Sequence, residues 1–203
     1  GTYNLSEKLS ATLGIRRSTD EKTIRTSVVD IRSVGSKLAA PPTEVYDIRA
    51  SEDWDATTPS FLLKYDFSPS VNLYGSVSKG YKSGGFQGQA PTGAAASTAF
   101  NPEFAWNYEF GLKSNLLENR LMLNISTFST DYEDLQVRQN ATKPGETIPI
   151  LRITNAAEGE VEGLEIEWNA VFNEHFSSWG SIAYLDSKYL NFIDNSGADV
   201  SGN

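Results

Sequence analysis

Cysteine is absent from the 203 residues, and histidine occurs once, at position 175. Without cysteine the chain can form no disulfide and no thiolate metal site or nucleophile, and one histidine cannot build a multi-histidine metal cage. Basic residues are also few, with 17 lysines and arginines against 26 acidic residues and a net charge of −9. Because phosphate binding needs a concentrated basic surface, this balance argues against a nucleic-acid partner.

Long apolar runs are missing too. No stretch approaches the roughly 18 consecutive apolar residues that a membrane-spanning helix needs. This excludes helical membrane proteins only, since the strands of a transmembrane barrel alternate outward apolar with inward polar residues and have a modest average hydropathy.

What the chain does contain is alternation with a period of two. Apolar residues occupy every odd position of residues 9–16, and four further runs follow this alternation with few exceptions: 61–67, 71–78, 106–113 and 164–170. Such alternation is typical of β-strands with one apolar face. We therefore predict an all-β, antiparallel structure.

Two segments alternate less regularly. Phe128 falls on the polar side of residues 121–132, which suggests either a bulge or a strand that leaves the apolar layer. Trp179 interrupts the pattern of residues 176–184 in the same way. The sequence leaves the strand register of both segments open.

Short and long connections follow one another in strict order. Short turns are predicted at residues 6–8, 68–70, 117–120 and 173–175, and long polar connections at 18–51, 83–102 and 138–146. This order places all short turns at one end of the sheet and all long loops at the other. Outer-membrane barrels have this arrangement, with short periplasmic turns and longer extracellular loops. Within the second of these long connections, residues 92–99 are low in complexity, which is typical of a mobile loop.

Strand length separates a membrane barrel from a soluble fold. The run from Val71 to Lys82 spans roughly 40 Å at about 3.3 Å per residue. Tilted by about 45°, it rises roughly 28 Å, close to the apolar band of about 25 Å in such barrels. Strands of soluble sandwiches usually have about 5 to 6 residues. The membrane interpretation is favoured, and a soluble β-sandwich that binds carbohydrate is the alternative.

A series of short segments occurs in a defined order along the chain. The first and most specific is LYGSVSKGYKSGGF at 73–86, and the others are FNPE at 100–103, NYEFGLKS at 107–114, DYEDLQ at 131–136, NAA at 155–157 and VEGLE at 161–165. In order and spacing this series resembles the barrel region of TonB-dependent outer-membrane receptors. The resemblance extends from about Thr2 to Tyr189.

The resemblance implies a barrel of about 22 strands, of which residues 1–203 would supply about seven to eight. Residues 1–203 would then be a partial barrel domain, with the plug domain and the C-terminal strands absent. It implies a receptor in the outer membrane of a Gram-negative bacterium that imports a scarce nutrient with energy from TonB. A ferric siderophore is the first expectation, and cobalamin or a glycan are others. The implied partners are the TonB complex, through the plug, and outer-membrane lipids with lipopolysaccharide.

No catalytic residues, metal ligands or cofactor are predicted. His175 stands in a short polar turn, so an outer-membrane enzyme such as an esterase, which needs a nucleophile and a base, ranks last. The resemblance places ligand contacts in the extracellular loops and the upper lumen. The candidate ligand-binding residues are Tyr81, Lys82, Phe86, Gln87, Phe100 and Tyr132.

Overall fold

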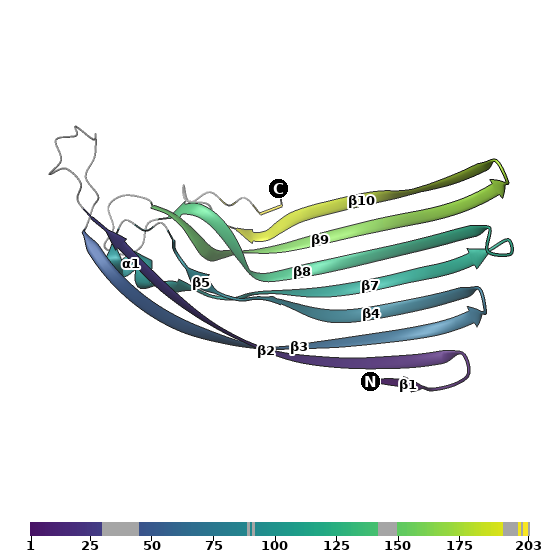
Figure 1. Cartoon of the computed structure of the whole chain (residues 1–203), viewed down its shortest axis with the longest axis horizontal. Helices are drawn as coiled ribbons and strands as arrows, with labels where there is room; N and C mark the ends of the chain where they lie inside the picture. The colour runs from purple at the N-terminus through teal and green to yellow at the C-terminus, as the bar shows by residue number, and fades with distance from the viewer. Residues whose placement is uncertain are drawn as a thin grey trace.

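A computed structural model describes residues 1–29, 45–88, 90, 92–141, 150–192, 199 and 201–202. Eight strands form one antiparallel sheet in the order β1-β2-β3-β4-β7-β8-β9-β10, and β5 and β6 form a separate hairpin (Figure 1). The strands of the large sheet are β1 (Thr2–Asn4), β2 (Leu9–Val28), β3 (Tyr46–Ser68), β4 (Val71–Lys82), β7 (Glu103–Leu116), β8 (Leu121–Ala141), β9 (Ile150–Asn173) and β10 (Phe176–Phe192).

The remaining elements lie between β4 and β7. They are β5 (Gly85–Phe86), α1 (Gly93–Ser97) and β6 (Ala99–Phe100). Every strand of the large sheet pairs with its neighbour in the chain once these three elements are set aside, so the sheet is a simple meander. The four short turns lie together at one end, and β5 and α1 lie at the other (Figure 1). The predicted all-β segment of seven to eight strands and the segregation of its turns are confirmed.

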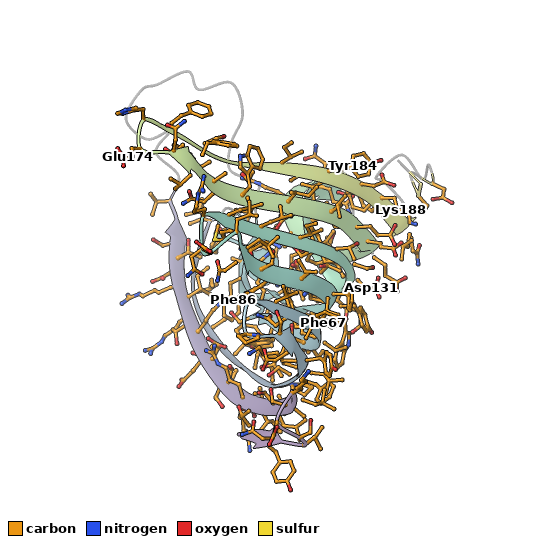
Figure 2. All side chains as sticks on the ribbon, turned by 90° about the vertical axis from the view of Figure 1, so that its right-hand side faces the viewer. Phe67, Phe86, Asp131, Glu174, Tyr184 and Lys188 are labelled. Atoms are coloured by element: carbon orange, nitrogen blue, oxygen red, sulfur yellow. The ribbon has the colours of Figure 1, made fainter. Side chains whose placement is uncertain are left out.

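The strand register separates the side chains into two faces. One row across the sheet is apolar and consists of Leu73, Leu112, Ile125, Ile166 and Ile182. The next row consists of Tyr74, Gly111, Ser126, Glu165 and Ala183. We call the first side the outer face and the second the inner face. The sheet is curved, with Phe86 in its hollow, which is the inner side, and Tyr184 and Lys188 on the opposite side (Figure 2).

The apolar outer face has no second layer of protein against it within the described residues. Ile15 is 80% exposed, Phe110 57% and Ile182 62%, and the aromatic side chains near the short turns, such as Tyr3 and Phe67, are exposed as well. A soluble sandwich would bury this face, so the alternative of a carbohydrate-binding module is not supported. Among the described residues, no helix has the length and apolar character to cross a bilayer.

The strands β2, β3 and β8 extend into the predicted long connections. The predicted connection 18–51 is wrong over much of its length, because β2 continues to Val28 and β3 begins at Tyr46, with pairing from Leu9–Tyr65 to Val28–Tyr46. In this projecting part β2 is largely polar, and the apolar residues of β3 from Tyr46 to Ala56 lie on the inner face, opposite to the apolar side of the predicted strands, so the outer apolar period does not continue into it. Likewise β8 continues to Ala141, and the rest of the predicted connection 138–146 lies outside the described residues.

The two open registers are now defined. β8 pairs with β7 without interruption from Leu121 to Glu133, so no bulge occurs at Phe128. Phe128 lies on the inner face because Gly163 stands opposite and leaves room for its ring. The bulge of β8 lies higher, between Tyr132 and Leu135, where Asp134 has a φ of 54°. Trp179 pairs with Asn169 and also belongs to the inner face.

The alanine-rich segment is a helical turn where the sequence suggested an irregular loop. Thr92 accepts a hydrogen bond from the backbone N–H of Ala95 at 3.1 Å and caps α1. Thr98 and Ser97 bond back to carbonyls of the same turn. Gly93 and Ala96 are buried, so alanine and glycine here serve close packing on β3.

Candidate ligand-binding site

The described part of residues 83–102, which we call the inner loop, folds into the hollow at the end opposite to the short turns (Figure 1, Figure 2). Phe86 makes an edge-on contact with Trp54 of β3, with ring centroids 6.3 Å apart. Gly84 permits this approach, since a Cβ there would lie 2.5 Å from the Trp54 ring. The Tyr46 hydroxyl donates to the carbonyl of Ala90 at 2.6 Å. Tyr46 and Trp54 are each only 8% exposed as a result.

The base of the inner loop is closed by one glutamine of β8. The side-chain amide of Gln136 donates to the carbonyl of Ser83 at 3.1 Å and to that of Asn101 at 3.0 Å. Its backbone N–H donates to the Glu103 carboxylate at 2.8 Å. Because Ser83 and Asn101 are the two ends of the loop, Gln136 holds them together.

A neighbouring asparagine of β9 joins the same place to the β8 bulge. The side-chain amide of Asn155 donates to the carbonyls of Asn101, Pro102 and Asp134 at 2.9, 3.3 and 2.8 Å. Its side-chain oxygen accepts a hydrogen bond from the Asn101 N–H at 2.9 Å. Three of the sequence segments that carry the family resemblance therefore meet at one point.

The six candidate residues are not brought together in one surface. Tyr81 lies on the outer side with its ring 5.6 Å from Phe104, and it borders a pocket of about 450 Å³ together with Asp20 and Ser83. The Lys82 ammonium donates to Glu103 at 3.2 Å. Phe100 covers Gly85 within the β5–β6 hairpin, where a Cβ would lie 2.8 Å from its ring.

The other three candidates reach the hollow. Phe86 packs on Trp54, as described above, and Gln87 bonds the backbone of Ile153. Tyr132 borders a pocket of about 270 Å³ between β8, β9 and β10, together with Leu135, Val161 and Tyr189. Gly159 forms part of its floor, since a Cβ there would have only Lys188 O at 3.5 Å and Leu135 at 3.9 Å as near neighbours.

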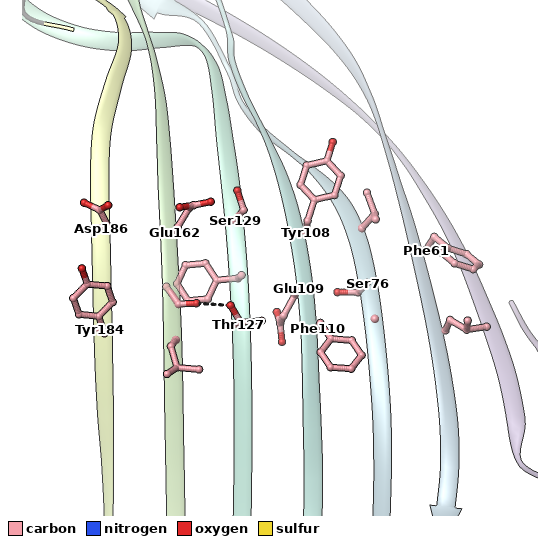
Figure 3. A pocket seen from close by; sticks show the side chains of 16 residues that line it. Phe61, Ser76, Tyr108, Glu109, Phe110, Thr127, Ser129, Glu162, Tyr184 and Asp186 are labelled. Atoms are coloured by element: carbon pink, nitrogen blue, oxygen red, sulfur yellow. Dashed lines mark hydrogen bonds between the residues drawn. The ribbon is translucent and has the colours of Figure 1, made fainter. Parts of the chain in front are cut away.

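A larger depression lies on the other face. It is bordered by Phe61, Tyr108, Phe110, Leu164 and Tyr184, all of which belong to the apolar rows of the outer face (Figure 3). The Thr127 hydroxyl, which also lines this depression, donates a hydrogen bond to the carbonyl of Gly163 at 3.0 Å. The depression opens outward from the hollow, so it does not form part of the site at the inner loop.

The sequence did not reveal Trp54, Leu135 or Tyr189 as parts of this region. Trp54 stands among acidic residues just after the predicted connection 18–51 and outside the predicted strands, which hid its place on the inner face. The sequence did indicate that Asn155 matters, because this residue belongs to one of the segments that carry the resemblance. Among the described residues there is no group of three or more acidic or imidazole side chains placed to hold a metal ion.

Comparison with known proteins gives a consistent result. The whole chain, residues 1–203, matches the family model described as TonB dependent receptor-like, beta-barrel. It is 26% identical over 144 residues to the metal-pseudopaline receptor CntO of Pseudomonas aeruginosa (strain UCBPP-PA14), a match that covers 70% of this chain and 18% of that receptor.

Solved structures show the same architecture. The ferric yersiniabactin uptake receptor FyuA from Yersinia pestis matches with a TM-score of 0.73 at 21% identity, covering 98% of this chain and 27% of that one. The ferric-catecholate import receptor Fiu from K12 E. coli matches with a TM-score of 0.71 at 17% identity, covering 98% of this chain and 28% of that one. At these identities the structural matches show the fold, and the chain spans less than a third of each receptor.

Proposed function

The chain belongs to the family of TonB-dependent receptors, and on this premise we propose that it forms part of a receptor that imports a ferric siderophore with energy from TonB. Proteins of this family are transport receptors of the Gram-negative outer membrane and not enzymes. The similar proteins named above are receptors for ferric or other metal chelates. That favours a ferric siderophore over cobalamin or a glycan.

In this proposal residues 1–203 are one part of a larger barrel. The open sheet, with β1 and β10 at its edges, supports this, as does the small share of each similar receptor that the chain covers. The plug and the contact with TonB would then come from other parts of the receptor. The exposed outer face would contact lipid and lipopolysaccharide, and the inner face would border the lumen.

The observation that carries the ligand proposal is the aromatic pocket at Tyr132. Its two tyrosines, its aliphatic side chains and its glycine floor suit one flat ring of a ferric phenolate or catecholate, and Ser187 and the Glu160–Lys188 ion pair complete its lining. Phe86 and Phe100 add aromatic surface nearby in the inner loop. Lys82 and Gln87 are engaged by Glu103 and Ile153, so we assign them to holding the loop in place. Tyr81, on the outer side, supports Phe104.

Uptake of iron tests the proposal. The gene is deleted in its host and restored as the complete gene, and cells starved of iron receive radiolabelled iron as ferric yersiniabactin, as a ferric catecholate or as ferric citrate. We expect uptake of at least one of the first two to depend on the gene and on TonB. Iron uptake unaffected by the deletion, with cobalamin or glycan uptake lost instead, would overturn the siderophore assignment.

A matched pair of tyrosines tests the pocket. Replacing Tyr132→Ala removes a ring from the inner face, whereas Tyr184→Ala removes one from the outer face, where Tyr184 is 68% exposed. An aromatic contact contributes about 1 kcal/mol, so we expect the affinity for the ferric siderophore to fall about five- to tenfold in the first variant and to stay unchanged in the second. Equal effects of the two changes would remove the pocket from the proposal.

A further inference from the structure

The inner loop contacts two projecting hairpins that lie far apart in the sequence. One is the β2–β3 arm, residues 15–28 and 46–59, which extends beyond the last β3–β4 pair at Ser60–Ser78. The other is the β8–β9 arm, residues 135–141 and 150–157, which extends beyond the β8 bulge. The positions of the two arms decide the shape of the hollow at the end where the ligand would enter.

The link to the β8–β9 arm is made by a glutamine side chain that acts like a strand. The Gln87 amide N–H donates to the carbonyl of Ile153 at 2.7 Å, and the Gln87 amide oxygen accepts from the Ile153 N–H at 3.1 Å. A neighbouring strand makes the same pair of bonds with its backbone. Within the described residues β10 pairs with β9 only as far as Phe192–Ala157, so this edge of β9 is otherwise unpaired at Ile153. Gln87 satisfies both backbone groups there.

The link to the β2–β3 arm combines a cation with two aromatic side chains. The Lys22 ammonium donates to the Ser83 hydroxyl at 2.5 Å and to the Gly84 carbonyl at 2.7 Å, and it lies 5.7 Å from the centre of the Trp54 ring. The Trp54 ring also contacts Phe86, which directly precedes Gln87 in the chain. Two successive residues of the inner loop, Phe86 and Gln87, therefore contact the β2–β3 arm and the β8–β9 arm respectively.

We propose that Gln87 is a positioning residue that joins the two arms through the inner loop, so that arms and loop form one rigid wall of the hollow and Phe86 is held at a fixed place. This inference needs no ligand and stands independently of the siderophore proposal.

Residues 1–203 contain no cysteine, so spin labels in this part attach only at introduced cysteines, and any cysteine elsewhere in the complete gene is first replaced by serine. Labels are placed at Arg49→Cys on the β2–β3 arm and at Arg138→Cys on the β8–β9 arm, two exposed positions. The protein is expressed from its complete gene and reconstituted in lipid vesicles, and the distance between the labels is measured by pulsed electron spin resonance. We expect one narrow distance population in the parent protein and a broadened one after Gln87→Ala.

The chain offers a matched control. Gln139 lies on the β8–β9 arm and donates to Thr154 of the same arm at 2.8 Å, so Gln139→Ala removes an amide without touching the inner loop. Gln87→Glu keeps the acceptor and loses the donor, and it should give an intermediate width. Thermal unfolding of each variant shows that it is folded. Unchanged distances after Gln87→Ala, or equal broadening after Gln139→Ala, would overturn the proposal.

Discussion

The Asn155 side chain makes four hydrogen bonds, none of which the alternation of apolar and polar residues could have predicted. Its four hydrogen bonds tie β9 to the start of β7 and to the β8 bulge. The family-like segments at 100–103, 131–136 and 155–157 are therefore explained by their meeting in space.

Removing this amide should loosen the junction. Asn155→Ala removes the amide donor of the Pro102 and Asp134 carbonyls and the acceptor of the Asn101 N–H, while Gln136 still donates to the Asn101 carbonyl, and we expect a loss of about 1 to 3 kcal/mol in stability. Hydrogen exchange at residues 100–103 and 134–136 should become faster. Asn124→Ala is the control, because Asn124 donates once, to Glu167 at 3.2 Å, on the open inner face. Protection that is equal in both variants would contradict the role of Asn155.

Gly111 shows why a small residue stands in the middle of a strand. The Tyr74 ring lies over it, and a Cβ at Gly111 would come within 2.6 Å of that ring. The Tyr74 hydroxyl bonds the Glu109 carboxylate, and the Lys113 ammonium lies 5.3 Å from the ring centre. The absence of a side chain at Gly111 thus leaves the space that the Tyr74 ring occupies.

We expect Gly111→Ala to displace Tyr74 and to lower stability by about 1 to 3 kcal/mol through overpacking. Gly75→Ala, on the outer face of β4, is the matched change, since its Cβ would have only ordinary contacts at 3.9 Å. Unfolding by urea in detergent compares the two. A neutral Gly111→Ala would show that the tyrosine moves aside without cost.

At the scale of single strands, the two faces predict opposite responses to charge. Ile125 lies in the apolar row between Leu112 and Ile166, while Ser126 faces inward opposite Glu165. Lysine on a lipid-facing strand costs about 2 to 4 kcal/mol near the bilayer midplane. We expect Ile125→Lys to reduce the folded fraction in the outer membrane and Ser126→Lys to be tolerated, because the new ammonium can pair with Glu165. Heat-modifiable gel mobility of membrane fractions measures both.

Strand identity was predictable only where the chain has one apolar and one polar face. The run Val71 to Lys82 is β4 to the residue. Beyond the apolar band the β2 half of the arm is largely polar, and the apolar residues of β3, Tyr46, Ile48 and Trp54, alternate on the inner face instead of the outer one. Trp54 was missed because this row lies on the face opposite to Phe61 and Leu63 and is interrupted by Glu52. The pairing of Gln87 with Ile153 joins positions 66 residues apart through a side chain, and nothing in the local sequence indicates it.

For the molecule as a whole, the edges of the sheet matter most. β1 and β10 each have one neighbour, so the described sheet does not close. Unpaired backbone groups are not tolerated within a bilayer. We expect the 203-residue chain, purified by itself, to show no defined single-channel conductance in a planar bilayer. A reproducible conductance of one size would mean that the chain closes on itself or assembles into a ring.

The packing of α1 on β3 also limits which side chains of residues 92–99 an antibody can contact. Gly93 and Ala96 are buried on β3, with a Cβ at Gly93 only 3.2 Å from that of Tyr46. An antibody can therefore reach Ala94, Ser97 and Thr98, which are exposed, but not the Gly93 and Ala96 side of the helical turn. Antibodies raised against a peptide of residues 92–99 should bind the denatured protein on a blot and leave intact cells almost unstained.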